Sequence, residues 1–71
     1  MFDRKRFYEA LDARGVSVTK LAELLKVHQA TLFRKIKGDT EFTRAEMQAV
    51  REALAIDQKE LDSIFFAQEL A

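Results

Sequence analysis

VSVTKLAELLKVHQATLFRKIKG, which spans residues 16–38, contains two short helical patterns separated by a tight break. Apolar residues recur every three to four positions on both sides of this break, which is the period of an α-helix. Val27 and Leu32 can form a hydrophobic staple across the start of the second pattern. The stretch therefore predicts a helix over 17–25, a two-residue turn, and a helix over 28–37 that is held at a steep angle to the first.

The same local unit occurs five times along the chain: an apolar residue, a capping residue, and a second apolar residue four positions after the cap. Ser, Thr and Asp are preferred helix caps, whereas His28 is the poorest cap of the five. Gly15 and Gly38 stand where a left-handed residue would end a helix. The units are Phe2-Asp3…Phe7, Val16-Ser17…Leu21, Val27-His28…Leu32, Phe42-Thr43…Met47 and Ile56-Asp57…Leu61. They predict a compact all-α fold of five helices, over 3–14, 17–25, 28–37, 43–55 and 57–69.

One face of each predicted helix is apolar, and these faces can meet in one core. The length of 71 residues suits one domain and is too short for two, so residues 1–71 are expected to form a single domain. The residues expected to point inward are Phe7, Ala10, Leu11, Leu21, Leu24, Leu25, Leu32, Ile36, Met47, Val50, Leu54, Leu61, Ile64 and Phe65.

Composition excludes several classes of protein. Without cysteine and with a single histidine, the chain can build neither a disulfide framework nor a metal site of the usual kind. It has no apolar run near 18 residues and no signal-peptide pattern, so we expect no membrane span and a cytoplasmic protein. Because it lacks a carboxylate pair facing an expected cleft, we do not expect an enzyme, a cofactor or a small-molecule substrate.

The charges are unevenly distributed although the net charge is +0. Residues 1–44 hold ten basic and six acidic side chains, whereas residues 45–71 hold two basic and six acidic ones. Many helical proteins divide charge in this way without functional reason, but a polyanionic partner would require it. The predicted helix 28–37 contains no acidic residue, which suits an approach to phosphates.

Side chains on that helix match the groups that read base edges. Gln29 can pair with adenine, Arg34 with guanine, and Ala30 or the methyl group of Thr31 can contact a thymine methyl. Phe33 could make a similar contact or could pack against the preceding helix or the 40–42 loop, and we favour packing.

The predicted helices also divide by charge at their first turns. The first, fourth and fifth begin with acidic residues, whereas the helices that begin at Ser17 and His28 carry none there. A short helix can rely on its cap alone, but an uncovered positive helix end also suits a bound phosphate.

The pattern Gly15-Val16-Ser17…Leu21-Ala22…Leu25…Val27…Gln29-Ala30-Thr31-Leu32…Arg34…Gly38 resembles the lambda-repressor-like, Cro-type helix-turn-helix family. The later pattern Glu41-Phe42-Thr43…Glu46…Leu54…Ile64-Phe65-Phe66 is similar to small phage-associated regulators of that family. The resemblance implies a helix-turn-helix over about 17–37 and a regulator that binds a double-stranded DNA operator with inverted-repeat symmetry as a homodimer. Gln29, Ala30 and Arg34 fall at base-contacting positions.

We expect a transcriptional regulator, a phage or prophage repressor, that acts at the nucleoid. The expected phosphate contacts are Thr19, Lys20, His28, Lys37 and Thr40. The chain departs from the family pattern in four places. Val18 replaces a frequent glutamine, Lys26 a turn glycine and His28 the usual Ser or Thr cap. Leu11 and Ile36 replace a frequent buried Arg–Glu pair, a change that an apolar contact can accommodate.

Three features leave alternatives open. His28 could be a pH-sensitive phosphate contact, although a cap on the surface is the simpler interpretation. The run Arg4-Lys5-Arg6 could clamp phosphate, although a solvated face is favoured. Phe66 and Leu70 could form a dimer contact or pack against the first helix, and the second is the default for so small a domain.

A rival function uses the same fold differently. An antitoxin or inhibitor subunit would act as a protein-interaction module through the last helix instead of the third. The chain could also be one domain of a longer regulator.

Overall fold

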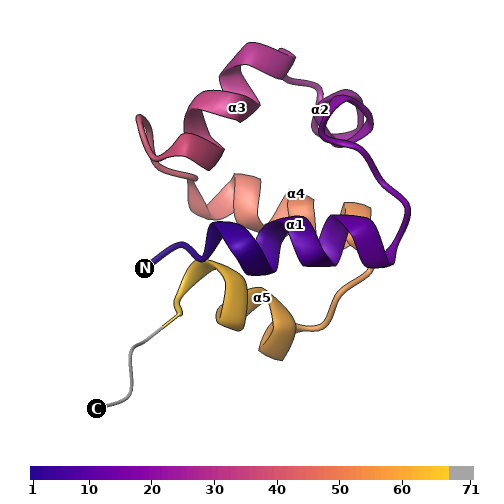
Figure 1. Ribbon diagram of the computed structural model, residues 1–71, viewed down its shortest axis with the longest axis vertical. Helices are drawn as coiled ribbons and strands as arrows, with labels where there is room; N and C mark the ends of the chain where they lie inside the picture. Colours follow the sequence, from indigo (N-terminus) through magenta and orange to yellow (C-terminus); the bar gives the residue numbers. More distant parts are fainter. Residues whose placement is uncertain (68–71) are drawn as a thin grey trace.

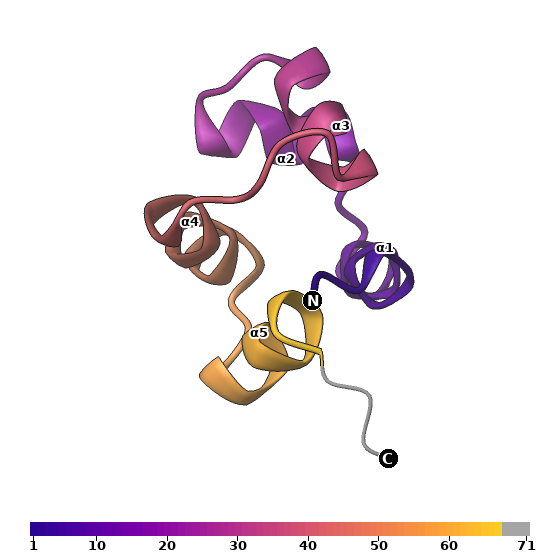
Figure 2. The same ribbon diagram turned by 90° about the vertical axis from the view of Figure 1, so that its left-hand side faces the viewer.

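The computed structural model describes residues 1–67. They form five α-helices without a strand, which confirms the all-α prediction. The helices are α1 (Arg4–Ala13), α2 (Val18–Leu25), α3 (Gln29–Lys37), α4 (Arg44–Leu54) and α5 (Gln58–Phe65). α2 and α3 lie at one end of the molecule and α5 at the other, with α1 and α4 between them (Figures 1 and 2).

Four of the five predicted caps begin their helices as expected. The side chains of Asp3, Ser17, Thr43 and Asp57 each accept a hydrogen bond from the backbone N–H three residues later. His28 makes no such bond, so the prediction of a side-chain cap there is wrong. Its backbone is extended, as at the other caps, but a His ring lacks the acceptor oxygen that Ser, Thr and Asp supply at this position.

Within residues 1–67, the backbone is left-handed at four helix ends, and two of these four residues are glycine. Gly15 (φ 64°) and Gly38 (φ 98°) lie where they were predicted, whereas Lys26 (φ 59°) and Ala55 (φ 54°) carry a side chain in the same region. At each of the last two, the next residue donates its N–H back across the turn, to Ala22 after Lys26 and to Arg51 after Ala55. These bonds satisfy carbonyls that the helix leaves open, at the cost of backbone strain.

All five helices contribute to one buried cluster, as the apolar faces predicted. Leu24 is an exception, because 45% of it is exposed. Since Leu21 and Ala22 are both buried, the inward face of α2 is centred between them, about 110° from Leu24 at 100° per residue. Leu25 and Met47 are half-buried at the edge of the cluster.

Four phenylalanine rings fill one side of this core. Phe2 packs against Phe7, Phe42 and Phe65, with ring centroids 5.2–5.4 Å apart. The pairing of Phe2 with Phe7 confirms the staple predicted for the first helix. α5 ends at Phe65, earlier than the predicted 57–69, of which residues 68–69 lie outside the described part. Within residues 1–67, no helix is long and apolar enough to cross a membrane.

Candidate nucleic-acid interface

The connection between α2 and α3 consists of three residues, Lys26 to His28, one more than predicted. In Figure 1 α2 is seen end-on, whereas α3 runs across the plane of the picture. α3 is anchored on its inner side by Leu32 and Ile36, which are 0% and 2% exposed. The short connection and these two anchors leave the opposite side of α3 uncovered.

The uncovered side of α3 carries most of the predicted base readers. Gln29, Ala30 and Arg34 are all exposed, and together with Phe33 and Lys37 they span one continuous arc at about 100° per residue. Thr31 is half-buried and lies on the flank of that arc. α3 therefore presents two polar side chains and one methyl group outward, with Thr31 beside them.

The side chain of Arg34 makes one weak hydrogen bond and no ion pair within residues 1–67. Its Nη2 donates a long hydrogen bond of 3.4 Å to Oγ1 of Thr31. Among residues 1–67, no carboxylate forms an ion pair with it. The guanidinium fork is thus exposed and available for a planar acceptor pair such as the edge of guanine.

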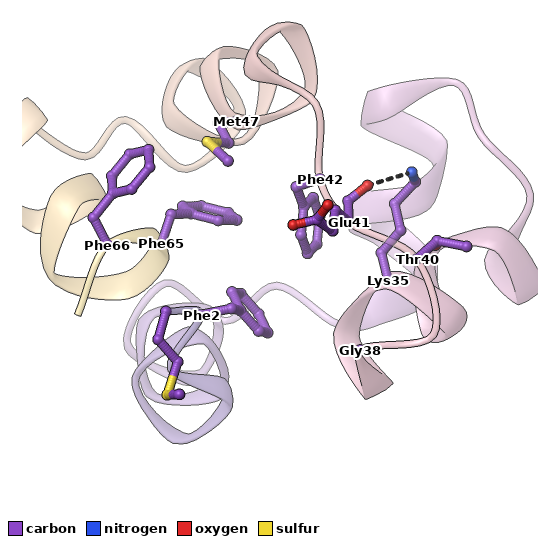
Figure 3. A pocket seen from close by; sticks show the side chains of 10 residues that line it. Phe2, Lys35, Gly38, Thr40, Glu41, Phe42, Met47, Phe65 and Phe66 are labelled. Atoms are coloured by element: carbon purple, nitrogen blue, oxygen red, sulfur yellow. Dashed lines mark hydrogen bonds between the residues drawn. The ribbon is translucent and has the colours of Figure 1, made fainter. Parts of the chain in front are cut away.

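Lys35 is committed to the fold instead. Its Nζ lies 3.1 Å from Oε1 of Glu46. Figure 3 shows its second contact, a hydrogen bond of 3.1 Å that Nζ donates to the backbone oxygen of Glu41. Burial opposes ionisation of Glu46, but the hydrogen bond from the N–H of Thr43 and the ion pair with Lys35 outweigh it and lower the pKa of that carboxyl. Lys35 therefore ties α3 to α4, and the remaining basic side chains of α3, Arg34 and Lys37, are exposed.

The predicted phosphate contacts are on the surface but differ in their surroundings. Thr19, Lys20 and His28 are exposed near the starts of α2 and α3, the two helices that have neither an acidic cap nor an acid in the first turn. Thr40 and Lys37 are exposed as well.

Lys37 and Thr40 both lie near acidic side chains. Nζ of Lys37 lies 3.6 Å from Oδ2 of Asp39, and both side chains are more than half exposed, so this pair is weak. Thr40 stands between Asp39 and Glu41, whose carboxylates would oppose a phosphate there. Near the end of α3, Lys37 is therefore the better candidate for a phosphate contact.

One basic side chain near α3 was not expected there. Nη2 of Arg4 donates to the carbonyl oxygen of Lys37 over 3.3 Å, which brings the start of α1 to the end of α3. Arg6 instead pairs with Asp3 and donates to Ser63 on α5. Arg4, Lys5 and Arg6 are all exposed, which agrees with the favoured interpretation of a solvated face, but Arg4 reaches α3 whereas Arg6 reaches α5.

Two aromatic residues are less covered than expected. Phe33 was expected to pack against α2 or the following loop, and 40% of it is exposed, so the domain covers it only in part. Phe66 was expected to pack against α1, but 51% of it is exposed just past the end of α5. Leu70, its proposed partner in a dimer contact, lies outside the described residues.

No cluster of three or more metal-ligating side chains occurs within residues 1–67. No protein-family model, curated protein or solved structure matches this chain.

Proposed function

We propose that this chain is a sequence-specific regulator of transcription that binds double-stranded DNA, a phage or prophage repressor of the lambda-repressor-like kind. In this proposal α2 and α3 form a helix-turn-helix, and α3 enters the major groove. The observation that carries the proposal is the uncovered, acid-free face of α3, which presents Gln29, Ala30 and Arg34 together.

The charges around α3 support a polyanion as the partner. Arg34 and Lys37 remain exposed after Lys35 is used by Glu46, and Arg4 joins them at the last turn. The positive ends of α2 and α3 carry no acidic side chain, so they can face phosphates on either side of the groove. Phosphate contacts would position the protein, and Gln29 and Arg34 would specify the sequence.

Selection of bound sites from a pool of random DNA duplexes tests this proposal. We expect one enriched sequence, and an inverted repeat if the protein binds as a homodimer. Binding should weaken as salt rises, because counterions are released from each neutralised phosphate. A pool that stays random after repeated selection at low salt would refute the proposal. The proposal includes a cytoplasmic location at the nucleoid.

A second candidate is a protein-interaction module, an antitoxin or inhibitor subunit that acts near α5. It is favoured by the exposed Phe66 beside a pocket of about 290 Å³, which Phe2 and Met47 also line (Figure 3). Replacing Phe66 with Ser would abolish partner binding in this case, whereas a DNA reader would keep its base preference at each half-site. Absence of any sequence preference in the duplex selection would favour this candidate.

A further inference from the structure

Phe33 is an apolar ring on the face of α3 that we assign to DNA. It is the one aromatic residue of α3, and 40% of it is exposed. A helix of a small domain usually turns such a ring toward the core, as α1 does with Phe7, which is 0% exposed. What sets Phe33 apart from the other exposed apolar residues is its place on the face of α3 that we assign to DNA.

Phe33 is not part of the buried core. Phe33 belongs neither to the buried cluster nor to the partly buried residues packed against it. Within residues 1–67, the close aromatic pairs join Phe2, Phe7, Tyr8, Phe42 and Phe65, and none includes Phe33. The exposed part of the ring is thus free to meet a ligand of α3.

The helical spacing places Phe33 among the predicted DNA contacts. It follows Gln29 by four residues and precedes Lys37 by four, so all three lie along one strip of α3. Ala30, three residues before it, gives the strip a second apolar contact. A ring in this position would meet base edges when Gln29 and Arg34 do.

We propose that Phe33 contacts the C5-methyl group of a thymine in the major groove and selects thymine at one position of the bound site. This inference rests on the proposed function. The thymine methyl is the apolar feature of the major-groove edges, and a phenylalanine ring can bury it without a hydrogen bond. A ring that met only sugars or phosphates would not distinguish thymine from uracil.

The test replaces each thymine of the selected site by uracil, which lacks this methyl group and pairs identically. For the unmodified protein, we expect one position where uracil weakens binding about three- to fivefold, the effect of one buried methyl group. In Phe33→Ala, the same replacement should have no further effect. Phe33→Gln serves as a second variant, because glutamine has a long side chain and favours helices. It should lose the uracil effect as Phe33→Ala does, even if shortening the side chain to alanine disturbs the fold.

Phe66→Ala is the matched control, because it removes the other exposed phenylalanine of residues 1–67, which lies past the end of α5. It should leave the uracil effect unchanged. Circular dichroism of every variant confirms that the helices are retained.

Three outcomes would overturn the inference and can be told apart. If the duplex selection enriches no sequence, the proposed function fails and the role of Phe33 fails with it. If a site is enriched but uracil weakens binding of Phe33→Ala as much as that of the unmodified protein, only the thymine contact is wrong. If Phe33→Ala binds DNA normally and loses self-association instead, the ring is a protein contact.

Discussion

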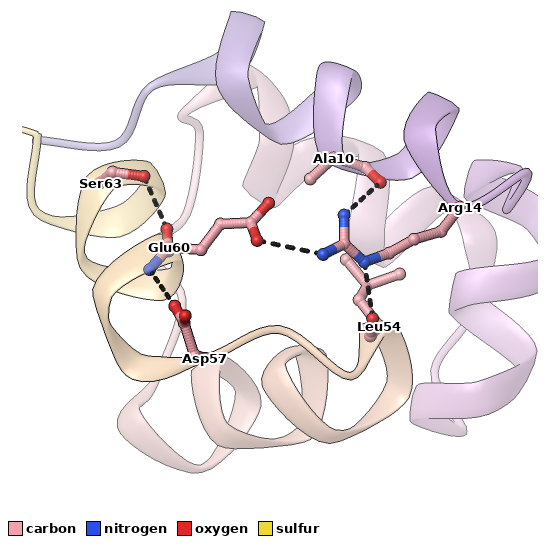
Figure 4. Close-up of polar contacts among 6 residues, drawn as sticks. All are labelled: Ala10, Arg14, Leu54, Asp57, Glu60 and Ser63. Carbon is pink, nitrogen blue, oxygen red and sulfur yellow. Dashed lines mark hydrogen bonds and ion pairs between the residues drawn. The ribbon is translucent and has the colours of Figure 1, made fainter.

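The guanidinium of Arg14 at the end of α1 donates through Nε to the carbonyl oxygen of Leu54 at the end of α4, over 2.7 Å (Figure 4). The same group donates to the backbone oxygen of Ala10 over 3.2 Å and to Oε1 of Glu60 on α5 over 3.0 Å. The last carbonyls of a helix have no partner inside it. Arg14 supplies one for α4 and links three helices at the point where the chain turns left-handed at Ala55.

We predict that Arg14→Lys lowers the free energy of unfolding by about 1–2 kcal/mol, because a single ammonium cannot reproduce three bonds from a planar fork. Glu60→Gln should cost less than about 1 kcal/mol, since the ion pair is partly exposed to water. Urea unfolding followed by circular dichroism measures both. Arg6→Lys is the control, because its ion pair with Asp3 lies at the surface. A loss for Arg14→Lys no larger than for Arg6→Lys would contradict the assignment.

Glu46 should make stability depend on pH in the acidic range. Its pKa is lowered below the ordinary value of 4.5, so the ionised form favours the folded state. This contribution is complete above about pH 4.5 and is lost as the pH falls through the lowered value. We expect Glu46→Gln to be less stable than the unmodified protein by about 0.5–1 kcal/mol at neutral pH, with the difference shrinking in acid.

Unfolding by urea at a series of pH values between about 7 and about 3 measures this convergence. Glu52→Gln, an exposed acid on the same helix, serves as the control. A constant difference between Glu46→Gln and the unmodified protein at all pH values would show that the carboxylate charge contributes nothing.

Glycine at Lys26 or Ala55 should stabilise the protein. Both residues are left-handed, a conformation in which a Cβ costs about 1–2 kcal/mol. Glycine relieves that strain, but it also raises the conformational entropy of the unfolded chain, which opposes folding. We therefore expect a net increase in the free energy of unfolding of about 0.5–1 kcal/mol for each change.

The melting temperature should rise by a few degrees in each case. Lys26→Ala separates strain from charge, because it removes the ammonium and keeps the Cβ. If Lys26→Ala stabilised the protein as much as Lys26→Gly, backbone strain would not be the cause.

Arg34 and Lys37 should differ in what their loss does to DNA binding. Arg34→Ala should weaken binding to the best site by about 1–3 kcal/mol and relax the preference at one base pair. Lys37→Ala should weaken matched and random duplexes alike and reduce the salt dependence by about one counterion. Gel shifts at several salt concentrations measure both effects. Lys59→Ala, an exposed basic residue on α5, is the control. Equal losses on all sequences for Arg34→Ala would refute base reading.

The sequence by itself determined the helices, because their signals are local. A cap such as Thr43 acts on an N–H three residues away, and Gly15 and Gly38 permit a left-handed turn wherever they stand. The repeated unit of cap and staple therefore predicted five helices with starts within one residue of those observed. The exception was His28, whose side chain does not perform the role that its position suggested.

Only the tertiary structure decided how exposed the side chains of α3 are and which partners they have. That Lys35 pairs with Glu46 while Arg34 stays unpaired within residues 1–67 depends on where α4 begins relative to α3. The approach of Arg4 to Lys37 joins residues 33 positions apart, which no local period encodes. Phe33 and Leu24 are exposed for the same reason, since burial depends on which neighbours cover a face and not on hydrophobicity alone. The sequence placed the candidate base readers on one helix, and the packing around that helix decided which of them face outward.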